Sequence, residues 1–356
     1  MHTLNEPRVS VVTPVYNGAK YLAECIESVL AQTYSNWEYL IVNNCSTDES
    51  LDIAQKYANR DPRIRVSSNS QFLGRIENEN NALRQIAADS KYCKVVHADD
   101  WIFPECLARM VDVAEQNPTV AMVSAYRLED DRVSLDGLPF PSVKTSGAEI
   151  CRRTLLGQIY VFGAPTSLLH RADIVRSQQS FYDASNDHGD LEACYRYLQH
   201  ADFGFVHQVL TFTRRHNEAA TGFSKRINTF VLGNLYCLMK YGPVYLTHDE
   251  YARAMRITMR GYYEFLASSA VRSKGKEFWQ YHKRGLGKLG MRIDRFRIAR
   301  VLARRVLRHA LNPGSTAEIL YRFLRRSPPG SMVPPTPGEP KNRSTEVHQF
   351  HEAARP

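Results

Sequence analysis

The sequence predicts an α/β protein in which a mostly parallel sheet is flanked by helices. Short apolar runs rich in β-branched residues alternate with amphipathic segments through the first part of the chain. This alternation is typical of strands joined by crossover helices. Polar or charged residues follow three of the apolar runs, at 13–18, 43–48 and 97–101. Ligands bind at the carboxyl ends of the strands in such sheets, so these three segments are candidate site loops.

The first strand and helix are predicted near the N-terminus. Val9 to Val15 is a short apolar run that leads to the turn pair Asn17-Gly18, as expected of a buried parallel strand that feeds a helix. From Tyr21 to Gln32 apolar residues recur three and four positions apart, which predicts that helix.

A second strand, predicted from Tyr39 to Val42, leads to Ser46 and Glu49. Serine three residues ahead of glutamate is the pattern of a capping box, so a helix is expected to begin near Asp48. The alternation continues with a strand near 64–67, a helix near 76–88, a strand near 92–97 and a helix with Pro104 in its first turn.

The C-terminal third is predicted to be mainly helical and basic. Basic residues crowd the segment from 272 to 308, and four arginines share one helical face: Arg297, Arg300, Arg304 and Arg308. The stretch 327–356 is rich in proline and polar residues and has little apolar surface to bury, so we expect a disordered tail.

Composition narrows the class of protein. Hydrophobic residues make up 43% of the chain, and no run approaches the roughly 18 consecutive apolar residues of a spanning helix. The first residues lack the pattern of a signal peptide, and the seven scattered cysteines have no zinc-site spacing. We therefore expect a cytoplasmic protein with reduced thiols. The formal charge of +9 suits nucleic acid, anionic lipid or a phosphate-bearing substrate alike.

Two adjacent carboxylates, Asp99 and Asp100, end the apolar run that starts at Lys94. Hard oxygen ligands at a strand end suit Mg²⁺ or Mn²⁺, and such an ion neutralises charge that grows on a diphosphate leaving group. The alternative is a solvated loop in which one carboxylate caps the helix that follows Pro104.

Residues 10–50 resemble the opening of the family 2 glycosyltransferases. The matching positions are Pro14, Tyr16-Asn17, Ser28–Leu30, Gln32–Tyr34, Glu38, Ser46 and Asp48. The resemblance includes Asp99-Asp100, in the place of the family's metal motif, and continues more weakly to about His216. It implies a GT-A type, Rossmann-like fold, a nucleoside-diphosphate sugar as donor, Mn²⁺ or Mg²⁺ as cofactor, and transfer with inversion to a saccharide or lipid-linked acceptor.

The resemblance also implies where the nucleotide binds. Thr13, Pro14 and Tyr16 match positions that line the nucleoside pocket in the family, and the Tyr16 ring is expected to stack on the base. Asn44 stands where an aspartate often accepts the imide N–H of uracil. Its amide oxygen can accept the same bond, so UDP is the expected nucleotide, although the amide also suits another base.

By the same resemblance, Asp99 and Asp100 hold the metal, and Asp99 also contacts the donor. His97 replaces the first acidic residue of the motif and is expected to support the site rather than to bind the ion. The closing element places Arg214 on the donor phosphates and His216 in the metal shell. The alternative is a solvated strand edge with two adjacent arginines.

Inverting transfer needs one general base near the acceptor hydroxyl. Arg196 follows Asp190 by six residues, a spacing that resembles the family's Glu-Asp motif, with Gly189 in place of the glutamate. Asp190 is therefore the predicted catalytic base, with His188 and Asp187 as alternatives. Asp190 or Asp187 as the N-cap of the next helix is the structural alternative.

Three regions follow from these patterns. We expect a catalytic domain at 1–223, with nucleotide-sugar binding at about 1–126 and acceptor binding at about 127–223. The small residues at 163–167 fit an acceptor pocket or a plain turn. A helical basic region is expected at 224–326, ahead of the tail at 327–356.

Two rival functions remain. A nucleotidyltransferase or dinucleotide-binding protein also begins with a strand, loop and helix, but the first loop has only Gly18 and lacks a glycine-rich phosphate motif. The other rival is a nucleotide-binding module whose basic helices contact a membrane or nucleic acid. No aromatic residues interrupt the arginines between 297 and 308. We therefore expect no nucleic-acid partner, whereas an anionic membrane surface fits.

Overall fold

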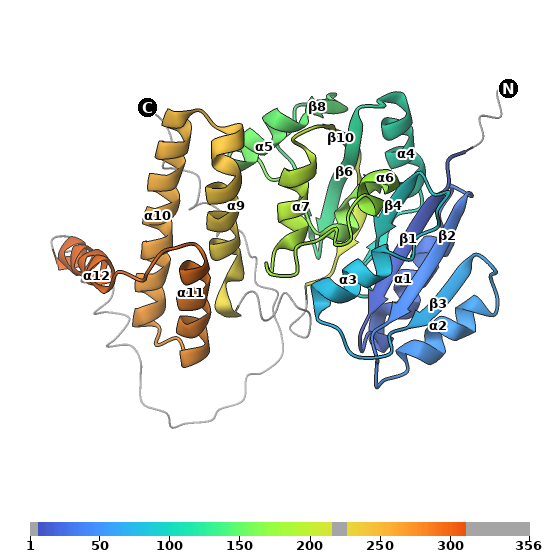
Figure 1. Ribbon diagram of the computed structural model, residues 1–356, viewed down its shortest axis with the longest axis horizontal. Coiled ribbons are helices and arrows are strands. Elements are labelled where there is room, and N and C mark those ends of the chain that lie inside the picture. The colour runs from blue at the N-terminus through green and yellow to red at the C-terminus, as the bar shows by residue number, and fades with distance from the viewer. Residues whose placement is uncertain (1–5, 216–225, 311–356) are drawn as a thin grey trace, which may run out of the picture. The chain divides into compact units, whose positions relative to one another are not determined.

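The computed structural model describes residues 6–215 and 226–310 (Figure 1). The chain forms one compact unit up to Val301 and a second from Leu302, of which the described part is the end of a helix. The predicted tail at 327–356 and the predicted metal ligand His216 lie outside the described residues.

Ten strands of the described part form one sheet. They are β1 (Val9–Val15), β2 (Trp37–Asn43), β3 (Ile64–Ser68), β4 (Tyr92–Val95), β5 (Trp101–Ile102), β6 (Val120–Glu129), β7 (Arg132–Ser134), β8 (Lys144–Ser146), β9 (Leu169–Arg171) and β10 (Asp202–Thr213). Their spatial order is β3-β2-β1-β4-β9-β6-β10-β5, with β7 paired to β6 and β8 paired to β10.

The first four strands in this order are parallel, as the sequence predicts. β9 then lies antiparallel between β4 and β6, while β6 and β10 are again parallel to each other. The predicted α/β class is confirmed, and the sheet is mixed in its second half. A turn into a strand after 163–167 was one of the sequence alternatives, but the antiparallel pairing of β9 with β4 and β6 was not predicted.

The main unit also contains helices, some of which cover the sheet while others pack beside it. They are α1 (Ala19–Leu30), α2 (Ser50–Ala58), α3 (Arg75–Leu83), α4 (Cys106–Gln116), α5 (Gly147–Leu155), the 3₁₀ turn η1 (Pro165–Ser167), α6 (Ala172–Arg176), α7 (Gly189–Tyr197), α9 (Thr229–Tyr245), α10 (His248–Val271) and α11 (Lys276–Lys288). The helix α12 (Arg295–Ala310) contains the boundary between the two units.

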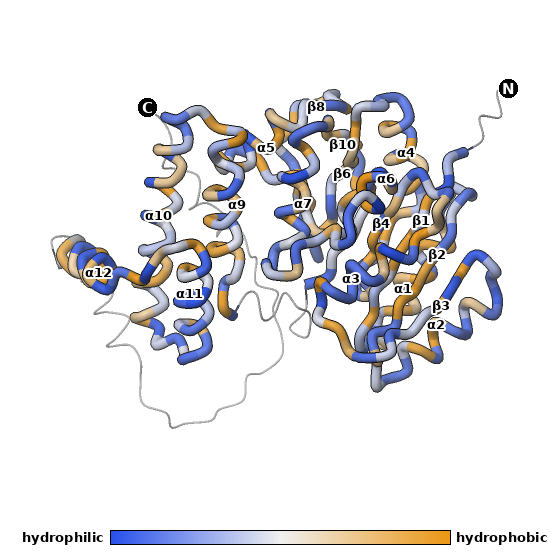
Figure 2. The backbone as a smooth tube through the Cα atoms, in the orientation of Figure 1, coloured by the Kyte–Doolittle hydropathy of each residue, from blue (hydrophilic) through white to orange (hydrophobic). Residues whose placement is uncertain are grey.

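Helices cover both faces of the central parallel strands, which explains why β1 and β2 are buried along almost their whole length. Val9 and Val11 of β1 pack with α1 and α4 in one cluster, whereas Val12 packs with α3 and α6 in another. Every residue of β2 is buried. Figure 2 shows the resulting concentration of hydrophobic residues along β1, β2 and β4.

The predicted capping box at the start of α2 does not form. The Ser46 hydroxyl instead accepts a hydrogen bond from the amide of Asn17 (3.0 Å). The Asp48 carboxylate accepts bonds from the amides of Ser50 (3.1 Å) and Ala19 (3.0 Å), the first residues of α2 and α1. One carboxylate therefore stabilises two helix N-termini.

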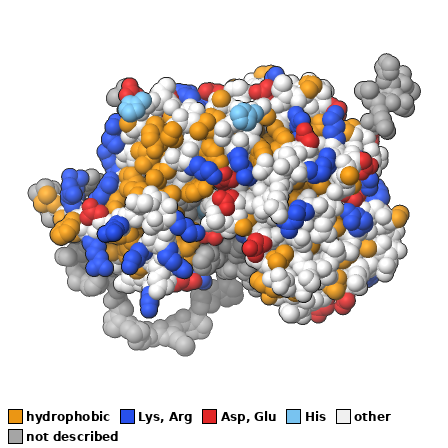
Figure 3. Space-filling model, viewed as in Figure 1, with side chains coloured by type: hydrophobic (Ala, Val, Ile, Leu, Met, Phe, Trp, Pro, Cys, Tyr) orange, Lys and Arg blue, Asp and Glu red, His pale blue; other side chains and the backbone are white. Residues whose placement is uncertain are grey.

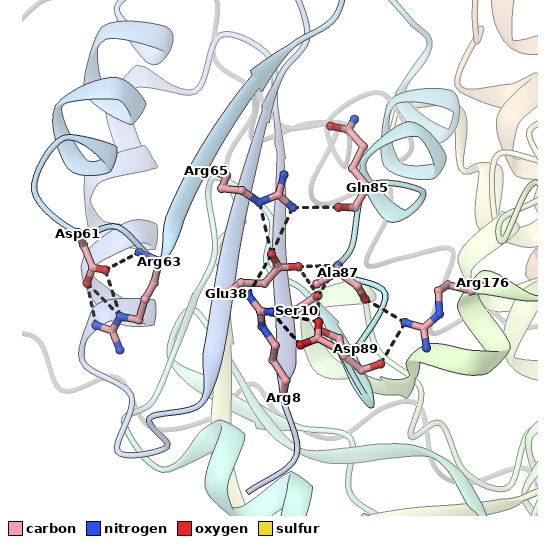
Figure 4. A network of polar contacts seen from close by, with 11 residues as sticks. Arg8, Ser10, Glu38, Asp61, Arg63, Arg65, Gln85, Ala87, Asp89 and Arg176 are labelled. Carbon is pink, nitrogen blue, oxygen red and sulfur yellow. Dashed lines mark hydrogen bonds and ion pairs between the residues drawn. The ribbon is translucent and has the colours of Figure 1, made fainter. Parts of the chain in front are cut away.

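A buried carboxylate, Glu38, ties the sheet together at the edge away from the candidate site loops (Figure 4). It accepts hydrogen bonds from the Ser10 hydroxyl (2.6 Å) and the Ala87 amide (2.7 Å). The guanidinium groups of Arg65 and Arg8 lie 3.2 Å and 3.7 Å from its other oxygen. These contacts join β1, β2 and β3 to the segment that follows α3.

The C-terminal helices belong to the same compact unit as the sheet. α9 packs against α5, α7, α10 and α11 (Figure 1). The fully buried carboxylate of Glu192 on α7 accepts hydrogen bonds from Lys240 (2.8 Å) and the Tyr241 hydroxyl on α9. These two bonds to one carboxylate oxygen connect α7 to α9. In the described residues, no helix has the length and hydropathy needed to cross a membrane.

The strand order also fixes where loops can meet. From β1 the chain adds β2 and β3 on one side of the sheet and then β4 on the other side of β1. The order in which strands are added therefore reverses between β1 and β4. Loops that leave the carboxyl ends of these two strands diverge and open a crevice between them. This edge holds Tyr16 after β1 and His97 to Asp100 after β4.

The protonation of one buried histidine, His170, makes the stability of the fold depend on pH. His170 on β9 is buried beside Phe181, and no described residue hydrogen-bonds to either ring nitrogen. Burial, with the charge of Lys94, lowers the pKa of His170 to about 3. In the unfolded chain the His170 imidazole takes up a proton below about pH 6.5, whereas in the folded protein it stays neutral. Its contribution to the free energy of unfolding is therefore fully present above about pH 6.5 and falls by about 1.4 kcal/mol for each pH unit below it.

We therefore expect the free energy of unfolding to fall between pH 7 and pH 5 by about 2 kcal/mol less in His170→Leu than in the wild-type protein. The free energy of unfolding in urea at the two pH values measures this difference. His200→Gln, which changes an exposed imidazole, is the matched control and should behave like wild type. Equal losses in wild type and His170→Leu would contradict the assignment.

Candidate donor-binding and catalytic site

The loop after β4 is built around the buried carboxylate of Asp100. Its Oδ2 accepts hydrogen bonds from the hydroxyls of Thr166 (2.7 Å) and Thr213 (3.4 Å), and its Oδ1 accepts one from the Arg214 amide (3.1 Å). Burial and the neighbouring charge of Asp99 raise the pKa of Asp100 to about 6. The Asp100 carboxylate therefore holds η1, the end of β10 and the loop after β4 together.

Asp99 is the more accessible of the two carboxylates. Asp99 is partly exposed, whereas Asp100 is 3% exposed. The sequence assigns both side chains to a metal ion, but three hydrogen bonds within the protein occupy most of the Asp100 oxygens. Asp99 is thus the carboxylate that is placed to meet a ligand, and Asp100 positions it.

Behind the loop, Thr166 links several parts of the site. Its hydroxyl donates to Asp100 and accepts from the His97 amide (3.1 Å). Its carbonyl oxygen accepts from Nζ of Lys94 (2.8 Å), a completely buried lysine on β4 whose pKa is lowered by burial. The small residues at 163–167, which the sequence placed at an acceptor pocket or a turn, therefore support the acidic loop.

A chain of charged groups runs from the acidic loop to α3. The His97 Nε2 lies 3.4 Å from a carboxylate oxygen of buried Glu79, which also pairs with Arg75 (3.1 Å). Burial opposes the charged imidazole, but the contact with Glu79 and the charges of Asp100 and Asp99 outweigh it and raise the pKa of His97 to about 9. The Glu79 carboxylate thus holds the His97 imidazole from α3, behind the acidic loop.

Arg214 reaches over the same loop from β10. Its Nε donates to the carbonyl oxygen of Asp99 (3.2 Å), and its Nη2 forms an ion pair with Glu24 on α1. The guanidinium lies over the ring of Tyr21, 4.4 Å from its centroid. The predicted phosphate-binding arginine is therefore held beside Asp99, although Glu24 shares its charge.

The residues predicted for the nucleoside lie in two different environments. The Thr13 hydroxyl is buried, donates to the carbonyl oxygen of Val96 (2.7 Å) and contacts the Tyr39 hydroxyl (2.8 Å), so it faces the core. Pro14 is partly exposed at the end of β1. The Tyr16 ring is 50% exposed and meets Phe72 edge-on at 4.8 Å. Of these three predicted residues, only Tyr16 presents an aromatic ring to solvent.

Asn44 holds a loop instead of facing a ligand. Its Oδ1 accepts from Asn69 (2.8 Å) and from the amide of Leu73 (2.9 Å), and its Nδ2 donates to the Leu73 carbonyl (2.8 Å). The side chain is 2% exposed. An oxygen with two donors already in place has no lone pair left for the imide of a base. The expectation for Asn44 is therefore corrected: the residue positions the loop that carries Phe72.

Asp190, the predicted base, is the second residue of α7 and is partly exposed. No described residue forms a hydrogen bond or ion pair with its carboxylate. Arg75 donates to the carbonyl oxygen of Asp187 (2.7 Å), and the charge of Glu79, followed by that of Asp190, raises the pKa of Arg75 against the effect of burial. Arg75, Glu79 and His97 thus connect Asp190 to the acidic loop.

The N-cap alternatives are not realised. α7 begins after His188, which makes no side-chain cap, and the Asp187 carboxylate accepts from the Tyr281 hydroxyl on α11 (2.7 Å). His188 Nε2 lies 3.0 Å from the Thr229 hydroxyl, inside the interface with α9. Of the three candidates for the base, Asp190 is the one whose side chain has no such partner among the residues that the structure describes.

Sequence reasoning missed four contributors to the site, which are Arg75, Glu79, Phe72 and Thr166. Three of them had a signal. Phe72 is an apolar residue in a polar loop, and Arg75 and Glu79 are opposite charges four residues apart on a predicted helix, a spacing that allows an ion pair. Thr166 had none, because its partner Asp100 is distant in the sequence.

The same architecture occurs in solved glycosyltransferases. TarS of S. aureus (residues 1–349), in complex with UDP-GlcNAc, superposes with a TM-score of 0.58 at 16% identity, over 79% of this chain and 80% of TarS. This likeness shows a shared fold, and the fold predicted from the sequence, a GT-A domain, is confirmed.

The family follows from the sequence match. The model "Glycosyl transferase family 2" matches residues 10–174, so the chain carries a family 2 glycosyltransferase domain. EpsE of Bacillus subtilis (strain 168), named as a glycosyltransferase, is 31% identical over 157 residues, which are 42% of this chain and 56% of EpsE. TuaG of the same organism, named for teichuronic acid biosynthesis, is 32% identical over 134 residues, or 38% of this chain and 51% of TuaG. The match thus spans about half the length of these relatives.

Proposed function

We propose that this protein is an inverting glycosyltransferase. It moves a sugar from a nucleoside-diphosphate sugar, with UDP as the expected nucleotide, to a saccharide or lipid-linked acceptor. The observation that supports this most is the loop after β4, where Asp100 is locked by Thr166, Thr213 and Arg214 and presents Asp99 at the switch point of the sheet.

The residues at this loop suit a divalent cation. Within the described residues no group of three or more His, Cys, Asp or Glu side chains gathers to hold an ion. An ion bound by one or two carboxylates would take the rest of its shell from water and phosphate oxygens. Asp99 is the proposed ligand for Mn²⁺ or Mg²⁺, with His216 as a second one. When bound, the ion offsets charge on the diphosphate leaving group.

The residues of the chain divide the transfer step among them. Arg214 places a positive charge beside Asp99, where the diphosphate leaves. The Asp190 carboxylate takes the proton from the acceptor hydroxyl, whose oxygen forms a bond to the anomeric carbon. The bond from that carbon to the phosphate oxygen breaks on the opposite face, so the configuration inverts.

The exposed Tyr16 ring supports the binding of a nucleotide base, which can stack on it, and UDP stays the expected nucleotide. In a thermal-shift screen with Mn²⁺, we expect UDP-sugars to raise the unfolding temperature more than GDP- or dTDP-sugars, because a bound donor stabilises the folded state. Tyr16→Ala and Phe72→Ala should each weaken donor binding about three- to tenfold. Phe140→Ala, which removes another exposed ring, is the control. No shift with any nucleotide sugar would contradict donor binding.

We also propose that α12 contacts the inner face of an anionic membrane. Phe296 is 87% exposed, and Arg295, Arg300 and Arg304 are exposed on the same helix. Apolar and basic side chains together suit a lipid interface.

Full-length protein should therefore sediment with vesicles that contain phosphatidylserine and not with phosphatidylcholine vesicles. Replacing Arg295, Arg300 and Arg304 by glutamine should reduce this binding at least about fivefold. Equal binding by the wild type and this variant would contradict a role for α12.

The alternative function is a nucleotide-binding protein or nucleotidyltransferase that transfers no sugar. It predicts release of pyrophosphate from a nucleoside triphosphate and a sugar phosphate, whereas glycosyl transfer releases a nucleoside diphosphate. Identifying the product separates the two.

A further inference from the structure

A cavity lies beside the segment that precedes Asp190. It has a volume of about 480 Å³ and lies between the loop 185–187, α9 and α11. Its walls include the apolar Leu232, the rings of Tyr236 and Tyr281, and the cationic side chains of Arg284 and Lys288. No sequence pattern predicts this cavity, because its residues come from three separate segments.

The cavity is directly coupled to the loop ahead of α7. Tyr281 donates to the Asp187 carboxylate (2.7 Å), and Lys288 donates to the carbonyl oxygen of Ser185 (3.2 Å). Asn186 also lines the cavity, and its Nδ2 is a buried donor without a partner among the described residues. The loop that forms one wall thus ends three residues before Asp190.

The cavity has an unbalanced charge. Arg284 and Lys288 form no ion pair with a carboxylate in the part of the chain that the structure describes. Asp187, the acidic residue among the lining side chains, is already engaged by Tyr281. Figure 3 shows Lys and Arg side chains gathered over α11 on the face in view. Two cations without counter-ions at a cavity favour an anionic ligand.

The walls are firmly built. An added Cβ at Gly285 on α11 would lie 2.0 Å from Leu232, and one at Gly233 on α9 would lie 2.4 Å from the His188 ring. Glycine at both positions lets α9 approach α11 and the α7 loop closely. The helices α9 and α11 and the loop ahead of α7 are therefore closely packed beside the cavity.

We propose that this cavity binds the acceptor, and that the acceptor is a saccharide with an anionic group, either a phosphate or a carboxylate. The inference rests on the proposed function. Arg284 and Lys288 pair with the anionic group, and the tyrosine rings contact apolar faces of the sugar. The bound acceptor would thereby contact the loop 185–187, three residues before Asp190, the proposed base that takes the proton from its hydroxyl.

Binding can be measured without catalysis. Full-length protein is titrated with maltotriose, trigalacturonate and glucose 6-phosphate, which are a neutral sugar, a carboxylate and a phosphate. The cavity variant is Arg284→Gln with Lys288→Gln. The control variant is Lys276→Gln with Lys283→Gln, which removes two exposed cations from the same helix outside the cavity.

We expect the wild-type protein to bind an anionic sugar at least about tenfold more tightly than maltotriose, and the cavity variant to lose at least about tenfold, or 1.4 kcal/mol. The control should lose less than about threefold, and the two anionic probes distinguish phosphate from carboxylate. Equal losses in both variants, or equal affinity for neutral and anionic sugars, would overturn the proposal. Donor cleavage by the wild-type protein is scored separately, so a missing transferase activity is distinguishable from a failed cavity.

Discussion

Asp190→Asn is expected to lower the rate of sugar transfer about 10²- to 10⁴-fold, the range that a positioned general base contributes. Asparagine keeps the shape of the side chain but cannot take the acceptor proton. The Asp190 carboxylate has no hydrogen bond or ion pair within the described residues, so the variant should fold with nearly wild-type stability. Initial rates at saturating donor and acceptor, together with a urea unfolding curve, measure both effects.

Asp187→Asn is the matched control for this prediction. Its amide oxygen can still accept the hydrogen bond from Tyr281, so transfer should fall less than about threefold. If Asp187→Asn lost activity and Asp190→Asn kept it, Asp190 would not be the base.

The second large effect separates the two carboxylates of the acidic loop. Asp99→Ala is expected to reduce transfer at least about 100-fold and to raise the Mn²⁺ concentration needed for half-maximal activity, because it removes the proposed ligand of the ion. Its free energy of unfolding should change little, since Asp99 is partly exposed.

Asp100→Ala should behave differently. It leaves the buried hydroxyl of Thr166 and the amide of Arg214 without their acceptor, which costs about 1–3 kcal/mol of stability for each unpaired group. Activity is then lost together with stability. A Mn²⁺ titration of activity and a urea curve on both variants test this division, and an Asp99→Ala protein that is destabilised as much as Asp100→Ala would contradict it.

The first half of the fold was predictable because its signals are local. β1 and β2 are buried on both faces and appear as continuous apolar runs, and the end points of β1 match the prediction. The short strands β5 and β9 carry no such signal, and their positions depend on partners far along the chain. Tertiary pairing alone selects them.

The candidate site shows the same division. Asp99, Arg214 and Asp190 could be proposed from the sequence, because their motifs resemble those of the family 2 glycosyltransferases, and their roles stay predictions. The inward direction of Thr13 and the closed hydrogen bonds of Asn44 could not, because they depend on Tyr39 and Leu73. A sequence shows which polar residues lie near a site, but not which of them are already satisfied.

Glycosyl transfer is tested most directly by the nucleotide that purified full-length protein releases from UDP-sugars in the presence of Mn²⁺. We predict release of UDP that stops when EDTA removes the ion and that falls at least about 100-fold in Asp99→Ala. Release of UDP that continues unchanged in EDTA, or a protein that cleaves none of the nucleotide sugars and forms pyrophosphate instead, would contradict a metal-assisted glycosyltransferase.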